Sequence, residues 1–174
     1  TYGRLWIICF TLMVFAGLLA LLRFTRLGLE MRAVTQNRAM AASMGIRTAR
    51  IEDVPIILSL IRELAEYERL SNDVVATIEG LRQHLFGDRR AAEALIAEFD
   101  HRPVGFAIFF HNFSTFLGRP GIYLEDLFVK PAVRGNGIGK SLLARLAEIA
   151  VERKCGRLEW AVLNWNTPAI GFYQ

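Results

Sequence analysis

The chain has 174 residues, of which 53% are hydrophobic, and its formal net charge is +4 at pH 7. That length suffices for one domain with a substantial core. The first fifty residues carry seven arginines against one glutamate, whereas the rest of the chain carries fourteen basic and sixteen acidic side chains. The positive charge is therefore local, and it gives no indication of nucleic-acid binding.

The first predicted element is an apolar run over residues 5–22, which begins at Leu5, ends at Leu22 and contains no charged side chain. A helix of that length spans about 27 Å, which matches the hydrocarbon core of a bilayer. We therefore expect a transmembrane helix, with a buried helix or a signal-peptide core as the alternatives. One arginine precedes the run and six follow it, which predicts that the later part of the chain is cytoplasmic.

Residues 28–46, with the sequence GLEMRAVTQNRAMAASMGI, resemble the cytoplasmic loop of bacterial urea and branched-chain amino-acid ABC-transporter permeases. The resemblance implies that residues 5–22 correspond to one of the membrane helices of these permeases. Such transporters need many spans and a partner ATPase, so we do not expect this chain to transport anything by itself. Residues 1–46 are thus predicted to be a membrane helix with a basic loop, and residues 47–174 a separate domain.

From residue 47 onward, apolar residues recur alternately with the period of a strand and with that of a helix. The predicted order of elements is βααβββαβα, which fits an α/β fold. The elements are a strand over 47–51, a helix begun by Asp53 and Pro55, a helix from Thr77 to Gly87, hairpin strands over 95–99 and 104–110, a loop over 112–121, a strand over 122–129, a helix over 140–154, a strand over 158–162 and a last helix capped by Thr167.

The segment RGNGIG, residues 134–139, joins a predicted strand to a predicted helix. Glycines at alternate positions let the backbone approach a ligand closely. The start of the helix adds unpaired N–H groups and the positive end of its dipole. This elbow suits a pyrophosphate, although an ordinary turn at a helix start would explain the glycines as well.

The pattern Arg134-x-x-Gly137-x-Gly139, with the flanking segments YLEDLFV and WNTPAIGFY, resembles the diamine and thialysine branch of the GNAT N-acetyltransferase superfamily. The similarity extends from about Ile46 to the end of the chain. It implies a mixed, largely antiparallel sheet with flanking helices, and acetyl-CoA as the co-substrate. The residues that the resemblance assigns to acetyl-CoA binding are Leu127, Phe128, Val129, Arg134, Gly135, Asn136, Gly137, Ile138, Gly139, Lys140 and Asn166.

The resemblance also implies two catalytic residues. With a pKa near 10.4, only about one lysine-like amine in ~10³ is unprotonated at neutral pH, so a base is needed. Glu125 and Asp126 are adjacent on a predicted strand, and strand alternation points them to opposite faces. The resemblance assigns the base to Glu125, acting through a water, and the acid that protonates the CoA thiolate to Tyr173. The alternatives are that these acids are solvated or paired, and that Tyr173 only packs.

The predicted function is acetyl-CoA-dependent acetylation of a small amine, such as a diamine or thialysine, by direct attack on the thioester. No metal is expected, because His84, His101 and His111 lack the spacing of metal ligands. We expect the catalytic part to lie on the cytoplasmic side of a bacterial inner membrane. Relatives form homodimers, and the sequence leaves the oligomeric state of this chain open. Relatives continue through a hairpin beyond Gln174, on which we expect activity to depend. The alternative is a permease-derived fragment whose attached domain is inactive or only binds CoA.

Overall fold

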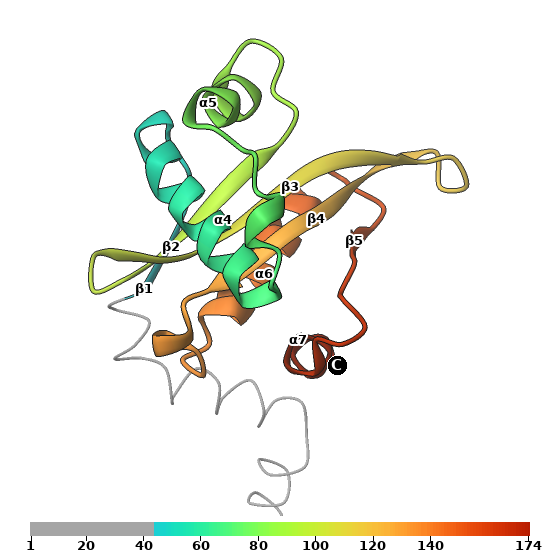
Figure 1. Cartoon of the computed structure of the whole chain (residues 1–174). Coiled ribbons are helices and arrows are strands. Elements are labelled where there is room, and N and C mark those ends of the chain that lie inside the picture. The colour runs from blue at the N-terminus through green and yellow to red at the C-terminus, as the bar shows by residue number, and fades with distance from the viewer. Residues whose placement is uncertain (1–43) are drawn as a thin grey trace, which may run out of the picture. The chain divides into compact units, whose positions relative to one another are not determined.

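The structure, a computed structural model, describes residues 44–174 (Figure 1), so the helix predicted over residues 5–22 lies outside the described residues. Within residues 44–174, no helix has the length and hydropathy that crossing a bilayer requires. The chain divides into two compact units, of which the second, Ser43–Gln174, contains the sheet and all the helices described below.

Five strands form one sheet in the order β1-β2-β3-β4-β5. Neighbouring strands from β1 to β4 are antiparallel, whereas β4 and β5 are parallel. The mixed, largely antiparallel sheet that the sequence predicted is therefore confirmed. The strands are β1 (Met44–Thr48), β2 (Glu93–Phe99), β3 (Arg102–Ser114), β4 (Arg119–Val129) and β5 (Leu158–Trp160).

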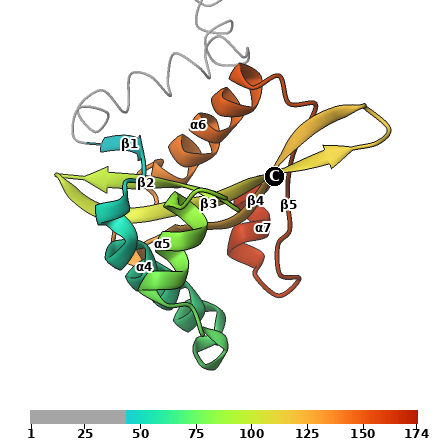
Figure 2. The same cartoon turned by 90° about the horizontal axis from the view of Figure 1, so that it is seen from above.

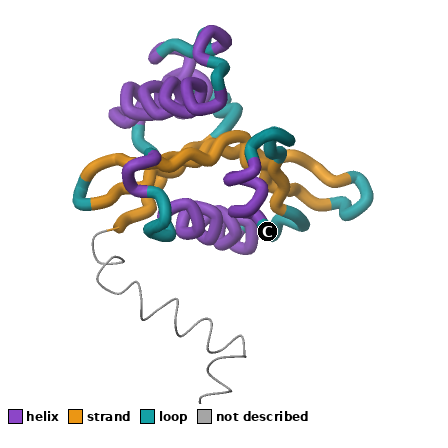
Figure 3. The backbone as a smooth tube through the Cα atoms, turned by 60° about the horizontal axis from the view of Figure 1, so that its bottom comes forward, coloured by secondary structure: helices purple, strands orange, loops and turns teal. Residues whose placement is uncertain are grey.

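Helices cover both faces of this sheet, as Figures 2 and 3 show. Helices α4 (Val54–Glu68) and α5 (Ile78–Phe86) lie on one face, which we call the α4 face. Helix α6 (Ile138–Glu152) lies on the other, which we call the α6 face. With α7 (Thr167–Tyr173) at the end of the chain, the order of strands and helices is the predicted one.

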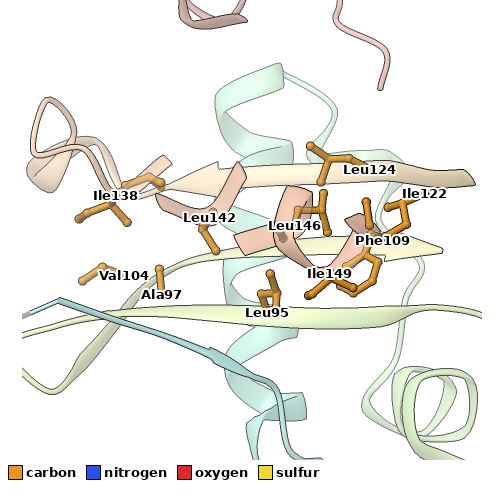
Figure 4. Packing of buried hydrophobic residues seen from close by; sticks show 13 residues of the cluster. Leu95, Ala97, Val104, Phe109, Ile122, Leu124, Ile138, Leu142, Leu146 and Ile149 are labelled. Atoms are coloured by element: carbon orange, nitrogen blue, oxygen red, sulfur yellow. The ribbon is translucent and has the colours of Figure 1, made fainter. Parts of the chain in front are cut away.

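Two hydrophobic clusters hold these layers together. On the α6 face, the predicted apolar stripe of α6 packs against side chains of β2, β3 and β4 (Figure 4). Leu142 and Leu146 of that stripe are fully buried. On the α4 face, Ile57 and Leu60 of α4 pack with Phe106 of β3. Residues on a strand alternate between the two clusters, which is why β2 and β3 are apolar along their whole buried length.

The ends of several strands differ from the prediction. β1 begins at Met44 and stops at Thr48, because residues 51–53 form a single 3-10 turn instead of extending the strand. β3 and β4 are longer than predicted, and the predicted loop over 112–121 shrinks to a turn over 115–118. Its polar residues belong to the ladder, since Asn112 pairs with Gly121. β5 stops at Trp160, so Val162 lies outside it.

The starts of two helices differ from the prediction as well. Thr77 starts helix α5 as predicted, because the Oγ1 of Thr77 accepts a hydrogen bond from the Gly80 amide at 3.1 Å and so caps the helix. Asp53 stands at the start of α4, but its carboxylate accepts from the Arg50 amide and the Arg47 guanidinium instead. Helix α7 is capped by Asn166 and not by Thr167, because the Asn166 Oδ1 reaches the Ala169 amide at 3.2 Å.

Gly105 of β3 provides a test of this packing. A Cβ added there would lie 2.6 Å from the Phe128 carbonyl oxygen and 3.3 Å from the Val129 Cα, both backbone atoms of β4. We expect Gly105→Ala to lower the free energy of unfolding by about 2 kcal/mol, because the two strands must separate. Gly45→Ala is the control, since a Cβ there meets nothing within 4 Å. Equal urea midpoints for the two variants would contradict the close approach.

Candidate active site

The elbow between β4 and α6 has the backbone conformation that its glycines favour. Gly135 and Gly137 have φ values of 82° and 78°, in the left-handed region that side chains other than glycine rarely adopt. Gly137 is the N-cap of α6, so the first amides of that helix point out of the elbow. The Ile138 side chain is 1% exposed and anchors the helix in the core, whereas Lys140 is exposed. The elbow thus offers backbone N–H donors and one cation to an anion.

Two side chains of the elbow brace the turn instead of pointing away from it. The Nε of Arg134 donates to the Val129 carbonyl oxygen at 2.8 Å, and the Nδ2 of Asn136 donates to the Val133 carbonyl oxygen at 3.1 Å. The Arg134 guanidinium lies over the ring of Tyr67, 4.4 Å from its centroid. Tyr67 belongs to α4, far away in the sequence, and the sequence analysis missed it because no local pattern marks it.

β4 and β5 separate beside the elbow. Their parallel pairing ends where Leu124 faces Trp160. From there to Val129, β4 has no β5 partner within the part of the chain that the structure describes. Phe128 and Val129 are buried in the two clusters. Any contact that these two residues make to an acetyl-CoA arm must therefore come from their backbone.

A β-bulge lies at this opening. Ile108 pairs with Asp126 and Phe109 pairs with Leu124, so Glu125 is an extra residue on β4. Leu124 belongs to the cluster on the α6 face, whereas Ile108, opposite Asp126, belongs to the cluster on the α4 face. Directly opposite residues share a face of the sheet, so Asp126 lies on the α4 face. The regular alternation on which the sequence analysis relied is therefore wrong between Leu124 and Asp126.

Two other carboxyl groups act on Asp126 through their charge, those of Glu125 and of Glu68 at the end of α4. Burial, and then repulsion from Glu125 and Glu68, raise the pKa of Asp126 to about 6. Burial also raises the pKa of Glu68 above its usual value. Glu125 itself is exposed. Negative charge thus accumulates at the opening, and the sequence analysis missed Glu68 because its proximity to Asp126 depends on tertiary packing.

This electrostatic strain predicts a dependence of stability on pH. A carboxyl group whose pKa is about 6 in the folded protein, against an ordinary value of 3.8, binds more protons in the folded than in the unfolded state. Stability should therefore fall as pH rises from about 4 to 7. We expect Asp126→Asn to raise the free energy of unfolding at pH 8 by up to about 3 kcal/mol, and to have no such effect near pH 3.

Urea unfolding at the two pH values measures this effect. The matched control is Glu125→Gln at the exposed neighbouring carboxyl, which should change the stability by less than about 0.5 kcal/mol. A gain for Asp126→Asn that is equal at both pH values would show that ionisation of Asp126 is not its cause.

α7 brings Tyr173 to the same opening. The Tyr173 ring stacks on Trp160, with centroids 4.9 Å apart, and Trp160 faces Leu124 on β4. The Phe172 ring lies against Gly139 of the elbow, where an added Cβ would be 3.4 Å from it. Burial raises the pKa of Tyr173 above 10, so its hydroxyl keeps its proton at neutral pH. It can therefore act as a proton donor.

Asn166, which the sequence analysis assigned to acetyl-CoA binding together with the elbow and residues 127–129, is 6% exposed. Its Oδ1 accepts hydrogen bonds from the Ala169 amide and, at 3.3 Å, from the Tyr67 hydroxyl. The oxygen is thus occupied by the protein itself, which leaves the amide nitrogen as the group that could contact a ligand.

Within residues 44–174, no three histidine, cysteine, aspartate or glutamate side chains are grouped so that they could hold a metal ion. The His111 Nε2 lies 3.4 Å from an Arg153 guanidinium nitrogen, and His84 and His101 are exposed.

Comparison with known families agrees with this geometry. The sequence model of the acetyltransferase (GNAT) family matches residues 58–174. The chain therefore belongs to the GNAT acetyltransferase family and is an acetyltransferase enzyme. Residues 1–59 match the family of permease components of the branched-chain amino acid transport system. Both resemblances that the sequence analysis stated are thus confirmed.

Individual relatives support the same family assignment. The chain is 42% identical over 137 residues to a thialysine N-epsilon-acetyltransferase of Bos taurus, covering 74% of this chain and 80% of that protein. It is 32% identical to the L-ornithine N5-acetyltransferase NATA1 of Arabidopsis thaliana, covering 74% of this chain and 76% of that protein.

Solved structures share the fold. An integron cassette protein of V. cholerae has a TM-score of 0.63 at 28% identity. The match covers 75% of this chain and 82% of that chain. An aminoglycoside acetyltransferase from a soil metagenome, in complex with sisomicin, has a TM-score of 0.67 at 19% identity. This match covers 77% of this chain and 87% of that chain, and an identity of 19% supports a shared fold alone.

Proposed function

We propose that this protein transfers the acetyl group of acetyl-CoA to a small amine that carries a second positive charge. The observation that carries the proposal is Asp126, half-buried at the opening between β4 and β5, whose carboxyl group is repelled by the charges of Glu125 and Glu68. An ammonium group placed among them would relieve their repulsion. The similarity to a thialysine N-epsilon-acetyltransferase and to an L-ornithine N5-acetyltransferase supports the same class of substrate.

In this proposal the elbow holds acetyl-CoA. The amides at the start of α6 and the Lys140 side chain receive the pyrophosphate, because the residues of the elbow leave that side open and the helix dipole favours an anion there. A Cβ at Gly135 would meet no protein atom within 4 Å, so the protein leaves this side of the elbow open. The rest of the acetyl-CoA molecule runs along the backbone of residues 127–129 and past the Asn166 amide toward the opening between β4 and β5.

The chemistry is a direct acyl transfer. Glu125, acting through a water, takes a proton from the ammonium group, and the free amine nitrogen then attacks the thioester carbonyl carbon. Backbone N–H groups of β4 near Leu127, where β5 no longer pairs, stabilise the negative oxygen. The carbon–sulfur bond then breaks, and Tyr173 gives its proton to the leaving thiolate. The attacking nitrogen loses its extra proton in the same collapse, and that proton returns through solvent to the Tyr173 oxygen, so the products are a neutral amide and the CoA thiol. Asp126 and Glu68 hold the second charge of the substrate.

A pair of amines of equal length tests this proposal. Cadaverine and n-pentylamine differ in one terminal ammonium group, so the carboxyl groups should give cadaverine the higher kcat/KM by about tenfold or more. Thialysine and ornithine should be acetylated as well. The measurement is release of CoA thiol with the acetylated amine identified by mass spectrometry. Equal kcat/KM values for the two matched amines would contradict a site for a second cation.

The second candidate, a permease-derived fragment whose domain only binds CoA, is favoured by the match of residues 1–59 to a permease component. Thermal stabilisation by acetyl-CoA, together with no turnover of any of these amines, would support that candidate. Turnover would exclude it.

We also propose that residues 1–46 attach the protein to the inner membrane of a bacterium, with the acetyltransferase domain in the cytoplasm. The uncharged run over residues 5–22 and the arginines after it support this proposal. Detergent-free lysis should leave the full chain in the membrane pellet. Met13→Arg, at the centre of the run, should shift the protein to the supernatant. Recovery of the unaltered chain in the supernatant would contradict the proposal.

The homodimer that the resemblance implies stays a prediction.

A further inference from the structure

α7, which carries Tyr173, is weakly held by packing. None of its seven residues is fully buried, and Tyr173, which stacks on Trp160, is half-buried. Its start is held differently, since the side chain of Asn166 is buried and its Oδ1 accepts from both the Ala169 amide and the Tyr67 hydroxyl. Within the described part of the chain, the bond from Tyr67 is the one side-chain hydrogen bond that joins the start of α7 to another element. The position of α7 therefore depends on a residue of α4.

The ring of the same tyrosine contacts the elbow. The Arg134 guanidinium lies 4.4 Å from the centre of the Tyr67 ring, while the Arg134 Nε holds the Val129 carbonyl oxygen at the end of β4. One turn earlier on α4, Glu63 accepts a hydrogen bond from the Lys130 Nζ at 2.8 Å. Residues four apart lie on the same side of a helix, so α4 contacts the segment between β4 and α6 at two points. Tyr67 thus touches the elbow with its ring and α7 with its hydroxyl.

We infer that Tyr67 is a positioning residue for acetyl transfer, which fixes α7 through Asn166 and links the position of α7 to Arg134 of the elbow. The hydroxyl group is the part that acts on α7, and the ring is the part that acts on Arg134. The two functions can be separated, because phenylalanine keeps the ring and removes only the hydroxyl. The inference relies on the proposed function in one respect, which is the assignment of the acid to Tyr173.

Tyr67→Phe in the full chain is the decisive variant. We expect the hydrogen exchange of the Ala169 and Ile170 amides to accelerate several-fold, because the cap of α7 loses its tie to α4. We expect kcat to fall about fivefold to tenfold, the scale that one lost hydrogen bond supports, while the KM for acetyl-CoA changes less than about twofold. Tyr123→Phe is the matched control for hydroxyl loss, because the Tyr123 ring packs at a tilt against Phe110 of β3 and, within residues 44–174, no hydrogen bond or aromatic contact joins it to α7. The hydrogen exchange of the α7 amides should stay unchanged in this variant.

A double-mutant cycle separates positioning from a merely structural effect. If Tyr67 acts through Tyr173, adding Tyr67→Phe to Tyr173→Phe should cause no further loss of kcat. An equal loss in both backgrounds, or unchanged exchange of α7 in Tyr67→Phe, would overturn the inference. If Tyr173→Phe alone leaves kcat unaltered, the acid assignment fails, and the exchange of α7 then decides by itself whether Tyr67 positions this helix.

Discussion

Gly137→Val should abolish acetyl-CoA binding, with the dissociation constant rising at least about a hundredfold. Gly137 has a φ of 78° at the N-cap of α6, a conformation that a β-branched residue adopts only with strain. If the backbone at position 137 left the left-handed region, the first amides of α6 would turn away from the ligand. If it kept that conformation, the valine side chain would add bulk where the pyrophosphate is expected to lie. Titration calorimetry with acetyl-CoA measures the change directly.

The control for backbone strain is Gly118→Val. Gly118 has a φ of 59° at the tip of the β3–β4 hairpin, and an added Cβ there meets no atom within 4 Å. Both variants carry a similar strain, but only one of them lies in the elbow. An affinity of Gly137→Val equal to that of the unaltered protein would place the acetyl-CoA site elsewhere. A matching loss in Gly118→Val would show that general destabilisation is the cause.

The elbow could be read from the sequence because its signals are local. Gly135 and Gly137 take up positive φ values, and Gly137 begins α6, within a few residues of where the sequence predicted that helix to start. The apolar stripe of α6 and the Thr77 cap are local in the same sense, since each depends on spacing within one or two helical turns.

The carboxyl groups at the opening could not be predicted in this way. The bulge at Glu125 depends on the register between β3 and β4, which places Asp126 opposite Ile108. Strand alternation, which the sequence prediction applied to Glu125 and Asp126, is interrupted between Leu124 and Asp126 because Glu125 is an extra residue on β4. Glu68 and Tyr67 reach the site only because α4 packs across the same face of the sheet, so their roles follow from tertiary contacts.

Tyr173→Phe should lower kcat by ~10² or more with little change in stability, because it removes the proton for the thiolate and keeps the ring that stacks on Trp160. Burial raises the pKa of Tyr173, which favours the protonated form that the acid needs. Stopped-flow detection of the CoA thiol, with thialysine or cadaverine as the acceptor, measures kcat. Unfolding in urea checks that the fold is retained.

Glu125→Gln should instead move the pH–rate profile to higher pH, since without the base only amines that are already unprotonated can attack. Asp126→Asn separates the two neighbouring carboxyl groups. With Glu125 as the base, Asp126→Asn should raise the KM for diamines more than it lowers kcat, because it removes a charge that holds the substrate. The opposite pattern, a collapse of kcat in Asp126→Asn with an unaltered pH–rate profile in Glu125→Gln, would assign the base to Asp126, whose pKa of about 6 suits that role.

Tyr173→Phe, Glu125→Gln and Asp126→Asn together test whether the protein supplies an acid and a base at all. If all three variants kept full rates, neither group would come from these residues, and positioning of the two substrates would have to account for turnover.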